Sequence, residues 1–197
     1  MEKEDLKTWM RQHYSKRFFT FPDMPSTKEL QFEKLSTKNF EQLYLLFEND
    51  ASPFVDERFK TYEGAKEYAA YLEEFGARLP KHGGQDWLFR LLNGEYAGIL
   101  HLYDLSLETF VQNHKRAWIG FATKEKFRKQ NITTKAVQHF IDYIFQFYPE
   151  IDFIHAMTEK ENEASIRFLL KCGFQFDPEE RLSKKYEFFI LFRPVLS

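Results

Sequence analysis

The sequence predicts an α/β (α+β) domain whose elements follow the order strand, two helices, three strands, helix, strand, helix and two strands. The clearest local signal is a hairpin. Two strand-like segments, Trp87 to Leu92 and Tyr96 to Tyr103, flank Asn93-Gly94, a dipeptide that suits the positive φ of a tight turn. A second signal is the aromatic strand Arg116 to Ala122, which leads through a polar loop into a helix with apolar residues at i, i+3, i+4 and i+7.

The other elements follow from the same kinds of pattern. Before the hairpin we expect a strand at Leu30 to Leu35, a helix capped by Ser36 or Thr37, a loop at Glu48 to Lys60, and a helix at Glu63 to Arg78 that Pro80 and Gly83-Gly84 end. After the long helix we expect a strand at Ile151 to Met157, a helix starting at Asn162, a short strand at Phe174 to Phe176, a charged loop at Asp177 to Lys185, and a last strand at Tyr186 to Phe192.

An extension precedes the first strand. Residues 1–27 begin as a helix with Leu6, Trp9 and Met10 on one face and then run into prolines. A dimer arm and a basic surface-binding helix are both open interpretations, but the apolar stripe is short and acidic residues dilute the positive charge. We therefore expect residues 1–29 to be an extension packed on the domain and residues 30–197 to be a single domain, with a homodimer as a possible assembly.

Composition excludes several classes of protein. A net charge of -2 and a pI near 6.3 speak against a nucleic-acid binder. The absence of a long apolar run and of a leader predicts a cytoplasmic protein without a membrane partner. The single cysteine, Cys172, indicates a reducing compartment. Its place beside Gly173 favours a small core residue over a nucleophile.

The loop between the aromatic strand and the long helix carries a candidate phosphate site. Lys124, Lys126, Arg128 and Lys129 lie there against one acid, Glu125, and a polar run opens the helix. The first N–H groups of a helix have no intrahelical partner and carry partial positive charge. A basic loop that leads into a helix start is therefore suited to binding a phosphate group.

The same loop resembles a known family. Arg128-Lys129-Gln130-Asn131-Ile132-Thr133 is similar to the Arg/Gln-x-x-Gly-x-Gly/Ala pyrophosphate loop of the GNAT superfamily of N-acetyltransferases. Asn131 stands where the first Gly is usual, and Thr133 where the second Gly or Ala is usual. Asn tolerates left-handed backbone, whereas Thr133 brings a branched Cβ to a place where the backbone should approach phosphate closely.

A second stretch carries the same resemblance. Glu159 to Phe174 resembles the family signature E/P-x-N-x-x-S/A followed by Gly-Phe, with Asn162 and Ser165 at a helix start and Gly173-Phe174 at its end. The resemblance is to the branch that contains ribosomal-protein N-terminal acetyltransferases. It implies a GNAT-like fold over about Leu30 to Phe192, with a central mixed, mostly antiparallel sheet of about seven strands flanked by helices.

The resemblance also implies the cosubstrate, acetyl-CoA, and the residues that contact it. The strand edge would pair with the pantetheine amides, and the loop amides would hold the pyrophosphate. The residues expected to contact the cofactor are Phe121, Thr123, Arg128, Lys129, Gln130, Asn131, Ile132, Thr133, Thr134 and Asn162. We expect Arg128 and Lys129 to be surface side chains that give the binding a salt dependence.

In the family an amine attacks the thioester directly. Many members use a tyrosine five residues before the Phe of the Gly-Phe pair to protonate the thiolate, but that position here is Leu169. Ser165 is the candidate acid, and the alternative is that it only caps its helix. For the base we name His101 and Tyr103, with backbone carbonyls and water as a third option. The six histidines show no metal-binding spacing, so no metal is predicted.

The sequence therefore predicts an N-acetyltransferase that moves an acetyl group from acetyl-CoA to a primary amine, either a protein N-terminus or a small molecule. The alternatives are a non-catalytic acyl-CoA-binding or protein-interaction module and a scaffold that no longer binds CoA. Acidic residues in the loops at 48–60 and 177–185 would favour a cationic acceptor. Basic residues in the same loops leave open the alternative that there is no charge preference.

Overall fold

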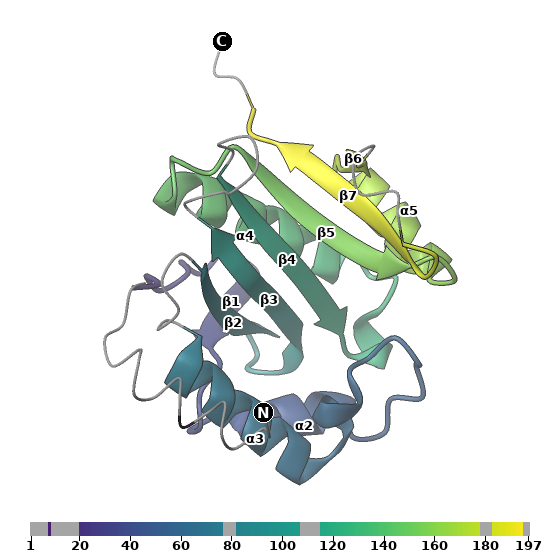
Figure 1. Cartoon of the computed structure of the whole chain (residues 1–197). Coiled ribbons are helices and arrows are strands. Elements are labelled where there is room, and N and C mark those ends of the chain that lie inside the picture. Colours follow the sequence, from purple (N-terminus) through teal and green to yellow (C-terminus); the bar gives the residue numbers. More distant parts are fainter. Residues whose placement is uncertain (1–7, 9–19, 77–81, 107–114, 178–182, 195–197) are drawn as a thin grey trace.

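Figure 1 shows the computed structural model of the chain. The structure describes residues 8, 20–76, 82–106, 115–177 and 183–194. The expected N-terminal helix falls almost entirely outside these ranges, as do Glu179 and Glu180 of the charged loop. Within the described ranges, no helix has the length and apolarity needed to cross a bilayer.

The described strands form one seven-stranded sheet of order β1-β2-β3-β4-β5-β7-β6. β4 and β5 are parallel, and all other neighbours are antiparallel. The strands are β1 (Leu30–Lys34), β2 (His82–Leu91), β3 (Tyr96–Ser106), β4 (Arg116–Thr123), β5 (Phe153–Glu159), β6 (Gln175–Phe176) and β7 (Tyr186–Phe192). The predicted mixed, mostly antiparallel sheet is confirmed.

The helices follow the predicted order. They are α2 (Phe40–Phe47), α3 (Tyr62–Phe75), α4 (Ile132–Phe147) and α5 (Glu163–Lys171), with two short 3-10 helices, η1 (Glu57–Lys60) and η2 (Glu125–Phe127). The expected cap of α2 is wrong, because the helix begins after Asn39 and not after Ser36 or Thr37. The Asn39 side chain accepts a hydrogen bond from the Ser36 N–H (2.8 Å) and donates one to Lys34 O (2.9 Å), which holds residues 36–39 in a turn.

The helices cover opposite faces of the sheet. α4 and α5 share a core with Trp87 and Leu100, whereas α2 and α3 share a second core with Leu88 and Ile99. Successive residues of a strand point to opposite faces, so each strand contributes to both cores. We call these the α4 face and the α2/α3 face. In Figure 1, α4 lies behind the sheet, and α2 and α3 lie at its lower end.

The segment before β1 packs on the α4 face. Phe21 and Met24 are buried in that core, and the Tyr143 hydroxyl of α4 donates a hydrogen bond to Pro22 O (2.8 Å). His139 Nε2 lies 2.7 Å from Pro25 O. Residues 20–27 therefore follow α4 without forming a helix. The division of the whole chain into an extension and a single domain stays a prediction.

Two glycines expected to end a helix lie in a strand instead. Gly83 and Gly84 belong to β2, which begins five residues earlier than predicted, and the pairing with β3 is irregular between Gly83 and Gln85. The backbones approach closely there, because a Cβ at Gly84 would lie 2.9 Å from Leu102 O. Glycine inside a strand is typical of such a bulge and close approach.

The centre of the sheet contains a split. β4 and β5 pair only from Arg116↔Phe153 to Ile119↔Ala156, although both strands continue. Beyond this point β4 keeps β3 as its neighbour and β5 keeps β7, so the two strands separate. The chain leaves β4 for α4 and leaves β5 for α5. Both helices therefore start beside the opening between the strands.

Candidate active site

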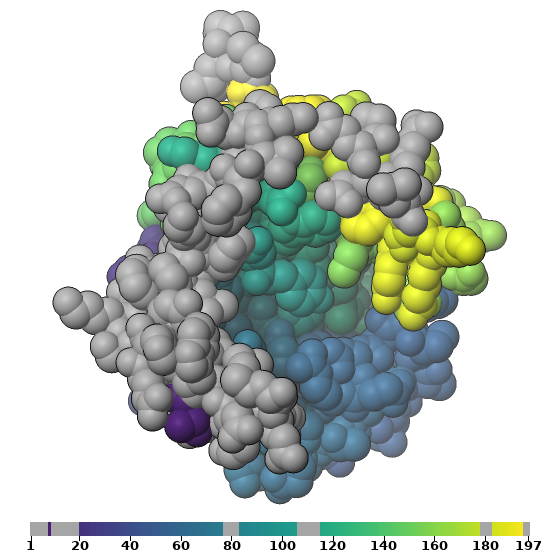
Figure 2. Space-filling model, in the orientation of Figure 1, coloured from purple at the N-terminus to yellow at the C-terminus, as the bar shows by residue number. Residues whose placement is uncertain are grey.

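A cleft of about 380 Å³ lies where β4 and β5 separate, within the range of roughly 300–1,000 Å³ typical of ligand sites. β4 contributes Trp118 to Phe121, β5 contributes Ala156 to Glu159, and α5 contributes Asn162, Ser165 and Leu169. In Figure 2 the teal strands lie recessed between the blue helices below and the yellow β7 beside them. The cleft therefore reaches the surface on the α2/α3 face.

The start of α4 has the geometry of an anion site. Asn131, the residue before α4, is left-handed at φ 63, and its side chain makes no cap hydrogen bond to the helix. The first helical bond joins the Lys135 N–H to Asn131 O (3.2 Å), which leaves the first-turn N–H groups of Ile132, Thr133 and Thr134 without a cap among the described residues. These groups are available to a phosphate.

The two departures from the family's glycine pattern have local explanations. Asn131 adopts the positive φ that a glycine would supply, as the sequence suggested. Thr133 places its hydroxyl 2.7 Å from that of Thr123, so its side chain is directed toward the end of β4.

Lys129 also has φ 63 and is exposed. Gln130 is exposed as well, and its amide donates to Lys126 O (2.5 Å).

The Arg128 side chain is partly exposed (35%), and it is also held in an ion pair, which the sequence did not predict. Its Nη2 pairs with the carboxylate of Asp50, whose side chain is only 2% exposed. Its Nε donates a hydrogen bond to Thr123 O (3.1 Å). The guanidinium therefore joins the loop before α4 to the segment after α2. Lys129 is exposed as expected.

Asn162 and Ser165 both line the cleft, and the structure separates their roles. The Asn162 side chain caps α5 by accepting a hydrogen bond from the Ser165 N–H (3.2 Å). Asn162, not Ser165, therefore supplies the cap, and the alternative role for Ser165 is wrong. Within the described residues the Ser165 hydroxyl has no partner, so it remains available to a ligand in the cleft.

Of the two base candidates, only Tyr103 lines the cleft. Its ring lies over Gly120, where an added Cβ would meet Cε2 at 2.6 Å and the hydroxyl oxygen at 2.8 Å. His101 stacks behind that ring (centroids 5.1 Å apart, planes at 8°) and is 2% exposed. The Tyr103 ring therefore lies between His101 and the cleft.

His101 belongs to a buried polar group. Its Nδ1 lies 2.7 Å from Asp86 Oδ2, which also accepts a hydrogen bond from the Tyr68 hydroxyl (2.7 Å). Phe59 stacks on the imidazole at 5.7 Å. Asp86 is 1% exposed, so these hydrogen bonds satisfy a carboxylate deep in the α2/α3 core. Sequence alone gave no signal for this group, because its members come from four separate elements.

The pKa values of Tyr103 and Cys172 are both raised, which keeps both groups protonated. Desolvation by the surrounding protein raises the pKa of the Tyr103 phenol, and the carboxylates of Asp86 and Asp56 add to the shift. The phenol is therefore protonated near neutral pH, and it is a hydrogen-bond donor and not a base. Burial raises the pKa of the Cys172 thiol to about 11, so the thiol is also protonated. Cys172 is a core residue, as predicted.

Large apolar side chains complete the cleft, and sequence reasoning did not select them. They are Phe54 from the segment after α2, Trp118 from β4, Met157 from β5 and Tyr186 from β7. The available signal was an aromatic residue in a loop expected to be polar, since exposed loops of this kind often carry function. Among the described residues, no group of three His, Cys, Asp or Glu side chains could hold a metal.

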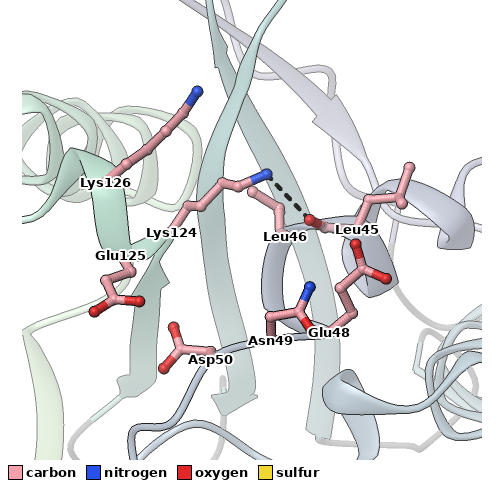
Figure 3. Close-up of a pocket in the computed structure, with 8 residues that line it drawn as sticks. All are labelled: Leu45, Leu46, Glu48, Asn49, Asp50, Lys124, Glu125 and Lys126. Atoms are coloured by element: carbon pink, nitrogen blue, oxygen red, sulfur yellow. Dashed lines mark hydrogen bonds between the residues drawn. The ribbon is translucent and has the colours of Figure 1, made fainter.

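A second hollow of about 430 Å³ lies between the end of α2 and the segment that follows β4 (Figure 3). Lys124 spans it and donates a hydrogen bond to Leu45 O (3.1 Å). Its other charged walls include Glu48, Glu125 and Lys126. Neither Ser165 nor Tyr103 lines this hollow. We therefore assign the active site to the smaller cleft, where both hydroxyls and the split between the strands meet.

The geometry can be compared with known proteins. The family model described as Acetyltransferase (GNAT) domain matches residues 29–175. No curated protein sequence matches significantly.

Three solved structures illustrate the likeness of fold. RimL, a ribosomal L7/L12 alpha-N-protein acetyltransferase solved with coenzyme A, is 15% identical, with 87% of this chain and 98% of that chain covered and a TM-score of 0.68. A GNAT-family acetyltransferase from Bacillus anthracis is 15% identical, with 86% and 97% covered and a TM-score of 0.63. A dodecameric spermidine N-acetyltransferase from Vibrio cholerae is 11% identical, with 84% and 95% covered and a TM-score of 0.60.

Proposed function

Because the chain belongs to the GNAT acetyltransferase family, we propose that its cleft transfers an acetyl group from acetyl-CoA directly to a primary amine. The observation that carries this proposal is the position of the Ser165 hydroxyl and Asn162 in the cleft between β4 and β5, beside the uncapped start of α4. The transfer needs a place for the cofactor, a donor to the departing thiolate and a route for the proton that leaves the amine. A phosphate site with an open strand edge supports the first part, and the Ser165 hydroxyl supports the second.

The chain's own groups fit acetyl-CoA on the α4 side of the cleft. The edge of β4 from Gly120 to Thr123 has no partner in β5 and offers backbone groups to an amide-containing ligand. The first-turn N–H groups of α4 face a pyrophosphate best if no side chain caps them, which is the case here. Lys129 adds an exposed positive charge, whereas Arg128 acts by holding the loop in place through Asp50.

The chemistry uses few side chains. The amine nitrogen forms a bond to the acetyl carbon, the carbon–sulfur bond breaks, and its electron pair passes to the sulfur of CoA. The Ser165 hydroxyl donates a proton to that sulfur and is replenished by water, while the amine releases its proton. The protonated Tyr103 hydroxyl contributes as a donor at the same place. Backbone carbonyls and water accept the proton from the amine.

Binding of acetyl-CoA is tested first by thermal unfolding. A ligand present at about a hundred times its dissociation constant stabilises a protein by roughly 2.7 kcal/mol, so acetyl-CoA should raise Tm clearly. The variant Thr134→Glu places a carboxylate in the first turn of α4, where it suits the helix dipole but repels phosphate. It should fold normally and lose the response. Gln138→Glu, further along the exposed side of α4, is the matched control.

Turnover separates the proposed function from the non-catalytic alternative. Release of free thiol from acetyl-CoA is measured with a panel of primary amines. Thermal stabilisation without turnover of any amine would support an acyl-CoA-binding module. No stabilisation at millimolar acetyl-CoA would exclude both functions. The expected cytoplasmic location and a homodimer stay predictions, the latter testable by sedimentation.

A further inference from the structure

The α2/α3 side of the cleft differs in chemistry from the side assigned to the cofactor. Strand register places Gly120 opposite His101, and the Tyr103 ring covers Gly120 on the α2/α3 face. Around this point stand Phe54, Trp118, Met157 and Tyr186. Phe54 is 42% exposed and Met157 51% exposed. Exposed apolar side chains that gather in a concave site are typical of a surface that a ligand covers.

The acidic residues of the neighbouring segments already have partners. Asp56 pairs with Arg58 (2.6 Å) and Glu57 with Lys60 (2.7 Å). Asp50 is buried against Arg128. The two carboxylates that line the cleft are also engaged, since Glu159 pairs with Lys185 (2.9 Å) and Asp104 has an interaction within the protein. These basic partners offset the acidic charge, so little net negative charge remains to attract a polycation.

We infer that the acceptor is a primary amine whose neighbouring substituent is aromatic or bulky and apolar, and that carries no second positive charge. This inference rests on the proposed function and names the substrate class of the same cleft. Phe54, Met157 and Tyr186 cover the apolar substituent, and the amine lies toward Tyr103. Arylalkylamines and peptides with an apolar first residue share this chemistry.

The apolar walls of the cleft also explain why no side chain has to act as a general base. Only the neutral amine has the lone pair that attacks the acetyl carbon. An apolar cleft disfavours the charged form of an amine, because burial removes water from the ammonium group, and the two carboxylates that line the cleft, Asp104 and Glu159, already have partners. Apolar walls therefore lower the pKa of a bound amine and favour its reactive form. Neither His101 nor Tyr103 has to remove that proton.

The test compares matched amines with acetyl-CoA in saturating amount. 2-Phenylethylamine and ethylamine differ by the aromatic group, and spermidine adds positive charge. One methylene in a hydrophobic pocket already discriminates by roughly tenfold or more, so kcat/KM for 2-phenylethylamine should exceed that for ethylamine by at least about tenfold. Spermidine should be the poorest substrate. The peptides Phe-Gly-Gly and Gly-Gly-Gly form a second pair that distinguishes a peptide source from a small amine.

Variants connect this preference to the cleft. Phe54→Ala and Met157→Ala should each remove most of the preference for the aromatic amine, so that kcat/KM for 2-phenylethylamine falls much more than kcat/KM for ethylamine. Leu92→Ala, 59% exposed on the hairpin, is the control and should change nothing. Faster turnover of spermidine than of 2-phenylethylamine, or an equal loss on all amines in the two variants, would overturn this inference and leave the transferase assignment intact. Turnover of no amine would overturn both.

Discussion

The two sides of the cleft present different kinds of chemical group to a ligand. On the proposed cofactor side the groups offered to a ligand are backbone: the first turn of α4 and the open edge of β4. On the proposed acceptor side they are side chains, with Phe54, Met157 and Tyr186 drawn from three separate elements. A backbone site keeps its geometry when residue types change, provided that φ and ψ are kept. This explains how Asn131 can replace a glycine in the loop, whereas the acceptor side depends on which residues are present.

The largest expected effect concerns the ion pair between Arg128 and Asp50, which joins the loop before α4 to the segment after α2. Arg128→Ala leaves the buried Asp50 carboxylate without its ion-pair partner, although the Ser52 N–H still donates to Oδ1 (2.9 Å), and loss of one member of a buried pair costs about 3 kcal/mol. Urea unfolding measures the fall in the free energy of unfolding. Lys129→Ala, one residue along and exposed, is the control and should cost little. Asp50→Asn combined with Arg128→Ala should recover part of the loss, and equal stability of all these proteins would show that the pair is unimportant.

The second prediction concerns the hydroxyl of Ser165, which lies in the cleft between the two proposed sides. Ser165→Ala removes the proposed proton donor, and general acid catalysis contributes about 10²-fold or more, so kcat should fall by about that factor. KM for acetyl-CoA and Tm should be nearly unchanged, because Asn162 still accepts the hydrogen bond from the backbone N–H of residue 165. Steady-state kinetics give this separation. The control is Ser26→Ala at an exposed serine. A variant with normal kcat would exclude Ser165 as the acid.

A smaller effect is expected at Gly120, where the Tyr103 ring lies against β4. Gly120→Ala would place a Cβ 2.6 Å from the Tyr103 ring, which must then move. Overpacking typically costs about 1–3 kcal/mol, and we expect kcat/KM to fall about tenfold with little change in acetyl-CoA binding. Adding Tyr103→Ala removes the clash. If the double variant is as fast as Tyr103→Ala alone, the two changes act through the same ring, whereas a slower double variant would show independent losses and contradict this geometry.

The smallest expected effect concerns the left-handed residue before α4. Asn131→Gly should leave the free energy of unfolding within about 0.5 kcal/mol, because glycine accepts φ 63 without strain. Asn131→Ala should cost about 1 kcal/mol, since alanine adopts this conformation less readily than asparagine. Both variants lose the hydrogen bond from Lys171 Nζ (3.2 Å), so their comparison isolates the backbone term. Chemical denaturation gives the difference, and alanine as stable as glycine would show that φ is not the constraint.

The sequence by itself determined the order of elements, the hairpin around Asn93-Gly94 and the loop that leads into α4. These features depend on residues close together in the chain, so local periodicity and turn chemistry were enough to predict them. The local pattern gave a wrong prediction at Gly83-Gly84, where two glycines indicated the end of a helix and the structure has a strand. The approach of β3 decided that they belong to a strand.

Only the tertiary structure decided what lies across the cleft. Arg128 meets Asp50 across 78 residues of sequence, and His101 is placed behind Tyr103 by contacts with Asp86 of β2 and Phe59 of η1. The apolar walls from Phe54 to Tyr186 come together only when β4 and β5 separate. Such contacts leave no local periodicity in a single sequence, because each partner is chosen by the packing of elements far apart in the chain. The loop and helix start that form the backbone half of the proposed site could therefore be located from the sequence, and the apolar side chains of the other half could not.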